Sequence, residues 1–122
     1  MALNIGSYIS GKVVILRCAG RLVFGDEAAA FRERIKNIRL GTNQIVVNLE
    51  ELEYIDSGGL GILVGALAST RIKGGEIKLV CPTLRVVELL RRTRLDTVFK
   101  TYGSDDEAVA AFDSRPESSV QS

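Results

Sequence analysis

Short runs of β-branched residues alternate along the chain with segments whose apolar residues recur at helical spacing. The first two runs, residues 3–9 and 13–19, are separated by Ser10-Gly11-Lys12, and this pattern predicts two antiparallel strands joined by a tight turn. The uninterrupted apolar run Ile45-Val46-Val47, within residues 44–49, is typical of a parallel strand that is buried on both faces. Weaker apolar runs predict further strands, at residues 76–81 and 98–102.

Four segments are predicted to be helices from their apolar spacing and their capping residues. The first, residues 26–40, begins with Asp26 as its N-cap and has one apolar face, made by Ala28, Phe31, Ile35 and Ile38. A central helix begins at Asp56-Ser57 and ends at Gly74-Gly75. Thr83 is the predicted cap of a third helix, and Ser104 that of a last helix at residues 104–112.

This order of elements predicts an α/β fold with a mixed sheet of about four to five strands, covered by about four helices. A chain of 122 residues with 46% hydrophobic composition is long enough for one domain with a real core. We therefore expect a single domain over residues 1–112. The Ser, Pro and Glu content of residues 113–122 predicts a disordered polar tail that makes no contribution to the fold.

The start of the central helix is the candidate functional site. Asp56 and Ser57 are both good N-cap residues, and the apolar run that begins at Leu60 follows at once. Free N–H groups and the positive end of a helix dipole favour an anion at such a position, so a phosphate on the Ser57 hydroxyl would be compatible with the fold. A plain capped helix start is the alternative interpretation of the same pattern.

The central helix also carries two distinct surfaces. Leu60, Leu63, Val64 and Leu67 fall on one apolar face, whereas a stripe of small residues lies on another. The stripe consists of Gly58, Gly61, Gly65 and Ala68. Glycines weaken a helix, so another element is expected to approach closely there, either the protein's own sheet or a partner protein.

Composition and motifs exclude most catalytic chemistry. The chain contains no histidine, which removes Ser-His-Asp and Cys-His catalysis and the commonest zinc ligand. Cys18 and Cys81 lie far apart in apolar runs and are expected to be buried thiols. Residues 6–13 nearly match a phosphate-binding loop, but Val13 stands where a magnesium-binding Ser or Thr belongs, and a strand follows. We therefore expect neither an enzyme nor a bound cofactor.

The net charge and the lack of targeting segments limit where the protein is expected to act and which partners it is expected to bind. The net charge of +1 provides no global attraction to nucleic acid or to an anionic membrane. The N-terminus lacks the features of a secretory signal, and the longest uncharged window, residues 57–70, is too short to cross a bilayer. We expect a soluble, cytoplasmic protein. Carboxylates between strand and helix, at Glu50, Glu51, Glu53 and Asp56, make a magnesium site conceivable, but a solvated acidic loop explains them without a metal.

Residues 46–61, Val-Val-Asn-Leu-Glu-Glu-Leu-Glu-Tyr-Ile-Asp-Ser-Gly-Gly-Leu-Gly, closely resemble the central signature of the STAS family, the sulfate transporter and anti-sigma factor antagonist domains. Further matches extend the resemblance over roughly residues 3 to 112. They are Gly20-Arg21-Leu22, Leu84-Arg85-Val86-Val87-Glu88-Leu89-Leu90 and Leu95-Asp96-Thr97-Val98-Phe99. The resemblance implies a STAS-like fold.

The resemblance also implies a function. In anti-sigma factor antagonists, the serine after this aspartate is phosphorylated by the anti-sigma factor, which is a serine kinase; that role falls on Ser57. The implied protein, while unphosphorylated, binds the kinase-type anti-sigma factor, frees a sigma factor only indirectly, and is inactivated when Ser57 is phosphorylated. Its implied partner-binding residues are Asp56, Ser57, Gly58, Gly59, Gly61 and Asp26. The oligomeric state stays open between a monomer and a weak dimer.

Two positions depart from the family pattern. Bacterial antagonists often have Asp where this chain has Val23, and often Ser or Thr where it has Gly58. An alternative function therefore stays open: a non-catalytic STAS scaffold, or a subunit of a signalling or membrane transport complex, in which Ser57 is only a helix cap. A nucleotide-binding or small-molecule enzyme is the third and weakest hypothesis.

Overall fold

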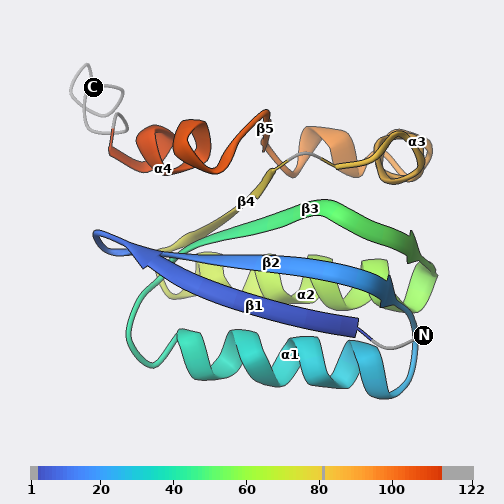
Figure 1. The fold of residues 1–122 in the computed structure, drawn as a ribbon, viewed down its shortest axis with the longest axis horizontal. Helices are drawn as coiled ribbons and strands as arrows, with labels where there is room; N and C mark the ends of the chain where they lie inside the picture. Colours follow the sequence, from blue (N-terminus) through green and yellow to red (C-terminus); the bar gives the residue numbers. More distant parts are fainter. Residues whose placement is uncertain (1–2, 81, 114–122) are drawn as a thin grey trace.

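The computed structural model describes residues 3–80 and 82–113, with α-helices on both faces of one sheet (Figure 1). Its elements follow the predicted alternation of strands and helices. In chain order they are β1 (Leu3–Ser10), β2 (Val13–Leu22), α1 (Asp26–Ile38), β3 (Gln44–Ile55), α2 (Ser57–Ile72), β4 (Glu76–Val80), α3 (Leu84–Arg92), the 3-10 turn η1 (Leu95–Thr97), β5 (Thr101–Tyr102) and α4 (Asp105–Asp113).

The sheet has five strands in the order β1-β2-β3-β4-β5. Strands β1 and β2 form the predicted antiparallel hairpin, with Gly11 in the left-handed region (φ 62°) at its turn. The other neighbouring strands pair in parallel, because a helical segment carries the chain back between each pair. The prediction of an α/β fold with a mixed sheet and four helices is confirmed.

The buried apolar residues form one large set, which also includes Val86 and Leu90 of α3, and one small set under α4. Helices α1 and α2 cover one face, and α3 and α4 lie on the other side (Figure 1). On the α1 and α2 side, strand residues such as Leu16 and Val47 pack with Phe31 and Leu63, all fully buried. On the α4 side the buried set is smaller and consists of Val13, Ile15, Val46, Val80, Ala108 and Phe112. Alternate residues in the first halves of β2 and β3 therefore contribute to both sets.

Cys18 confirms the prediction of a buried thiol. Its side chain is 1% exposed, and burial raises the pKa of the thiol to about 12. Cys81 lies outside the described residues, as do residues 114–122 of the predicted tail. None of the helices in the described ranges combines the length and apolar character that a membrane span requires.

The prediction of an acidic loop after the third strand is wrong. Strand β3 continues through Glu50, Glu51 and Glu53 to Ile55, because this half of the strand pairs with the end of β2 after a register shift. The three glutamates point to solvent, whereas Leu52 and Ile55 are buried. The two buried apolar residues hold the strand in the sheet, and the carboxylates are its exposed positions.

Two details of the predicted helices also need correction. Asp26 is the first residue of α1 and not its N-cap; Gly25 occupies that position with φ 111°, and no side chain caps the helix. On α3, the apolar residues allow two faces, either Leu84, Val87 and Leu90 or Val86 and Leu89; the structure buries Val86 and Leu90, one from each, and leaves Leu84 82% exposed. The predicted caps Thr83 and Ser104 are confirmed, since their hydroxyls accept hydrogen bonds from the N–H groups of Val86 and Glu107.

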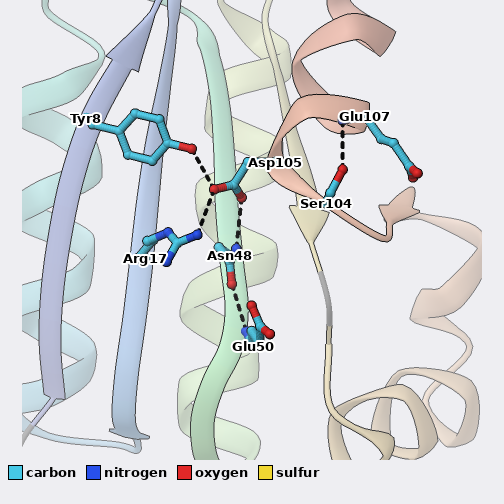
Figure 2. A network of polar contacts seen from close by, with 7 residues as sticks. All are labelled: Tyr8, Arg17, Asn48, Glu50, Ser104, Asp105 and Glu107. Carbon is cyan, nitrogen blue, oxygen red and sulfur yellow. Dashed lines mark hydrogen bonds and ion pairs between the residues drawn. The ribbon is translucent and has the colours of Figure 1, made fainter.

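Helix α4 is fastened to three strands by one carboxylate (Figure 2). Asp105 is 8% exposed and accepts hydrogen bonds from the Tyr8 hydroxyl (2.6 Å) and the Asn48 amide (2.8 Å), and it pairs with Arg17 (3.2 Å). Burial raises the pKa of Asp105, but these three partners lower it by more, so the net pKa lies below the ordinary value. An ionised Asp105 thus positions α4 over its apolar set.

Leu63→Ala should reduce the free energy of unfolding by on the order of 2 to 5 kcal/mol, because the side chain is fully buried (0% exposed) and truncation leaves a cavity. Leu84→Ala is the matched control, since the same atoms are removed from an exposed position; its effect should stay within about 0.5 kcal/mol. Urea unfolding measures both. Equal effects would contradict the assigned helix faces.

Low pH should weaken the hydrogen bonds and the ion pair by which Asp105 holds α4 on the sheet. Because the folded-state pKa of Asp105 is lowered, its contribution is present above the unfolded value of about 3.9 and is lost as pH falls through the folded value. The loss of stability between about pH 7 and about pH 3 should therefore be smaller in Asp105→Asn than in the wild type. Urea unfolding at both pH values measures it, with the exposed neighbour Asp106→Asn as control. An unchanged pH dependence in Asp105→Asn would contradict the assignment.

Candidate functional site

Ser57 lies at the first turn of α2, directly after the end of β3. Its side chain is exposed, and the loop from β2 to α1 lies beside it at the same edge of the sheet (Figure 1). The N-cap of the helix is Asp56, as predicted, so the Ser57 hydroxyl is not the capping group. The first turn therefore presents a hydroxyl that the helix does not need for its own start.

The Asp56 carboxylate holds this corner together. It accepts a hydrogen bond from the N–H of Gly59 (2.8 Å), within α2, and from the N–H of Phe24 (3.1 and 3.2 Å), in the loop after β2. The hydrogen bond from Gly59 is the main reason that the pKa of Asp56 lies below its ordinary value, with further backbone donors at Phe24 and Gly58. The side chain stays ionised and joins two segments that are far apart in sequence.

Gly58 and Gly59 allow the close approach that this bridge requires. A Cβ added at Gly59 would lie 2.1 Å from the carbonyl oxygen of Leu22, and one added at Gly58 would lie 2.5 Å from Cβ of Phe24. Gly59 is buried, so its geometric role is packing within the chain. The glycines of the predicted small-residue stripe therefore have different surroundings. Gly58 packs against the chain itself, whereas Gly61 and Gly65 are exposed, with open space where a Cβ would lie.

The structure brings most of the predicted partner-binding residues together at one corner. Asp56, Ser57, Gly58 and Gly61 follow one another on the first turns of α2. Asp26 is exposed at the start of α1, beyond the loop, and is not among the residues that line the hollow beside Ser57. Val23, where the family often has Asp, is half-buried, and its carbonyl accepts a hydrogen bond from the N–H of Ala28 (3.1 Å).

Phe24 is a site residue that the sequence analysis missed. Its side chain is 80% exposed although its backbone is fixed by Asp56. With Arg32 and Ile62 it borders a hollow of about 360 Å³ beside Ser57, and most of this surface is apolar. An aromatic residue between a strand and a Gly-Asp helix start was the available signal. That pattern does not indicate that the Phe24 side chain is exposed, because its exposure depends on how the loop packs against α2.

The acidic residues near the site do not form a metal centre. In the part of the chain that the structure describes, no three His, Cys, Asp or Glu side chains come together in a way that could hold a metal ion. Near the end of β3, Tyr54 instead forms a cation–π contact with Arg21, whose guanidinium lies 5.3 Å from the centre of the ring. The corner is thus built from backbone donors, one capping carboxylate and exposed aromatic residues.

These features define a STAS-type domain: a mixed five-stranded sheet, helices on both of its faces, and a serine at the capped start of the central helix. The family model described as the STAS domain matches residues 4–108, and the chain belongs to this family. The expected resemblance is therefore confirmed.

Three relatives illustrate the similarity. A Thermotoga neapolitana protein named as a candidate anti-sigma factor antagonist is 41% identical over 69 residues, which span 57% of this chain and only 61% of that protein. The crystal structure of a candidate anti-sigma factor antagonist of Thermotoga maritima is 32% identical, with a TM-score of 0.81 over 88% of this chain and 92% of that one. The Bacillus protein SpoIIAA in its phosphorylated form shares the fold, with 19% identity and a TM-score of 0.70 over 91% and 99% of the two chains.

Gly59→Ala should lower the free energy of unfolding by about 1 to 3 kcal/mol, because the added methyl group meets the carbonyl of Leu22 and must push the loop away. Gly65→Ala makes the same change on the same helix in open space, and should raise the free energy of unfolding by roughly 0.5 to 1 kcal/mol through helix propensity. Urea unfolding measures both variants. Stabilisation by Gly59→Ala would contradict the close contact.

Proposed function

We propose that this protein is an anti-sigma factor antagonist that binds a kinase-type anti-sigma factor and is inactivated when that partner phosphorylates Ser57. The observation that carries the proposal is an exposed Ser57 hydroxyl on a helix start that Asp56 already caps. Membership of the STAS family and relatives named as candidate anti-sigma factor antagonists support the general role. The protein is then a substrate and a regulator, and the kinase activity belongs to the partner.

The helix start can accept a phosphate without a change of fold. Free N–H groups and the positive dipole end of α2 favour an anion at its first turn. Asp56 takes its hydrogen bonds from Gly59 and Phe24, so a modification of Ser57 leaves the capping bonds in place. The modification therefore changes the charge of a surface and leaves the core intact.

That surface is suited to contact with another protein. Phe24 is 80% exposed and the hollow next to Ser57 is mainly apolar, so a partner docked there would exclude water from the serine. A phosphate adds roughly −1.5 to −2 charges at neutral pH, and its desolvation in such an interface is costly. Phosphorylation would thus release the partner, and the unphosphorylated form would sequester it away from the sigma factor.

The partner-binding residues in this proposal are those at the corner, Asp56, Ser57, Gly58 and Gly61, with Phe24 added. Asp56 and Gly58 act mainly by holding the loop and the helix in position, whereas Ser57, Gly61 and Phe24 present the contact surface. Asp26 lies farther along α1 and would touch only a partner that extends beyond the loop. Gly59 is buried and contributes through packing and through the N–H that it donates to Asp56.

Ser57→Asp should weaken binding of the anti-sigma factor strongly, whereas Ser57→Ala should retain it, and both variants should stay folded because Asp56 supplies the cap. Ser7→Asp is the matched control: it adds the same charge at an exposed position on the edge strand β1. The partner is first recovered with the protein from its own cells, and its affinity for each variant is then measured by calorimetry.

The stricter test is direct phosphorylation. The protein is incubated with the recovered partner and ATP, the modified residue is mapped by mass spectrometry, and the affinity is compared before and after. Modification at Ser57 with loss of binding is the expected result. If the partner binds firmly but leaves Ser57 unmodified, the switch is wrong and the protein is a STAS scaffold, the alternative that Val23 favours.

A further inference from the structure

A continuous groove runs between α1 and α2, starting at Ser57. Its first part is the hollow of about 360 Å³ that borders Phe24 and Ser57, and its second part is a hollow of about 260 Å³ that reaches Ser69. The two parts share Arg32, Gly61 and Ile62, so they form one surface feature, the α1–α2 groove. The two helices lie side by side on one face of the sheet (Figure 1), and each connects two parallel strands.

The charged side chains that line this groove are all cationic. They are Arg32, Lys36 and Arg39, and no acidic side chain of the described residues lines either part. Lys36 forms an ion pair with Glu33, which does not line the groove; Lys36 Nζ lies 3.7 Å from Glu33 Oε2. The Nε atom of Arg39 is buried and has no hydrogen-bond partner in the structure. A protein with a net charge of only +1 thus concentrates positive charge along this groove.

The rest of the lining is apolar or small. Phe24, Ala29 and Ile62 offer apolar contact near Ser57, and Gly61 and Gly65 have no side chain to keep an approaching backbone away. The path along α2 from Ser57 to Ser69 is about 18 Å long at the usual rise of an α-helix, which matches a partner helix of roughly three turns. Arginine side chains at such a site recognise carboxylates with paired hydrogen bonds.

We propose that the α1–α2 groove binds an acidic amphipathic helix of the partner protein, with apolar residues near Phe24 and carboxylates facing Arg32, Lys36 and Arg39. This inference rests on the proposed function, which supplies a protein partner at Ser57. A polypeptide fits better than a nucleic acid, because the groove lies between two helices and its only aromatic residue is Phe24, at one end.

The groove also explains why phosphorylation would act so directly. Ser57 and Arg32 line the same hollow. A phosphate on Ser57 therefore lies beside a cation that the acidic helix needs, and it competes with that helix from within the chain. The phosphate acts as an internal substitute for the partner's carboxylates, in addition to its own desolvation cost.

The test compares two triple variants with equal loss of charge. The groove variant carries Arg32→Gln, Lys36→Gln and Arg39→Gln; the control carries Arg85→Gln, Arg91→Gln and Arg92→Gln on the exposed surface of α3. The probe is the anti-sigma factor recovered with the wild-type protein. The groove variant should bind it at least about tenfold more weakly, and the α3 variant within about twofold of the wild type. Raising the salt concentration should weaken the wild type more than the groove variant.

Arg39 is half-buried, so the melting temperature of each variant is measured first. If the groove variant is unfolded, Arg32→Glu with Lys36→Glu, both at exposed positions, replaces it and should abolish binding. Wild-type affinity in a folded groove variant overturns the inference, even where Ser57 is phosphorylated normally. Loss of binding in the groove variant supports the groove, and if the bound partner also leaves Ser57 of the wild type unmodified, the kinase switch alone is overturned. Binding of a short DNA duplex through the same residues, with unchanged affinity for the protein partner, also overturns it.

Discussion

One carboxylate determines the geometry of the candidate site. Asp56 binds the N–H of Gly59 and the N–H of Phe24, and so joins the start of α2 to the loop that precedes α1. Without this bridge, the ends of β2 and β3 would still be neighbours in the sheet, but the loop would lose its side-chain hydrogen bonds to the start of the helix. The absence of side chains at Gly58 and Gly59 is part of the same constraint, because the loop lies where Cβ atoms would be. The exposed serine and the apolar hollow follow from a contact made mostly by backbone.

A second carboxylate performs the corresponding task on the opposite face. Asp105 accepts hydrogen bonds from Tyr8, Arg17 and Asn48, which lie on three neighbouring strands, and so fixes the start of α4. The contrast between the two carboxylates is informative. Asp105 is 8% exposed and its partners are side chains, as expected for an anchor within a packed layer, whereas Asp56 is half-buried and its partners are the backbone N–H groups of a buried Gly59 and an exposed Phe24. A partner docked on α1 and α2 therefore meets a rigid corner, while the other layer is held independently.

The sequence was sufficient for features that local chemistry decides. The hairpin at Gly11 and the caps at Asp56, Thr83 and Ser104 each depend on a few adjacent residues, and all were predicted correctly. Features that depend on pairing between distant segments were not predictable in the same way. The glutamates after β3 looked like a loop because charge alone does not reveal that Leu52 and Ile55 pair with the end of β2. The exposed position of Phe24, and the meeting of Tyr8 with Asp105 across 97 residues, likewise exist only in the folded chain.

The separation of capping from the modifiable hydroxyl decides what kind of switch the site can support. If Ser57 were the cap, a phosphate would change both the charge and the stability of α2, and the two effects on binding could not act independently. Because Asp56 supplies the cap and its pKa is lowered by the N–H groups that it accepts from, the helix start is stable in either state of the serine. In the proposed switch, the chemical change is confined to electrostatics at the mouth of a cationic groove. A surface of this kind can reverse its affinity for a partner while the sheet, both cores and the loop at Phe24 remain as they are.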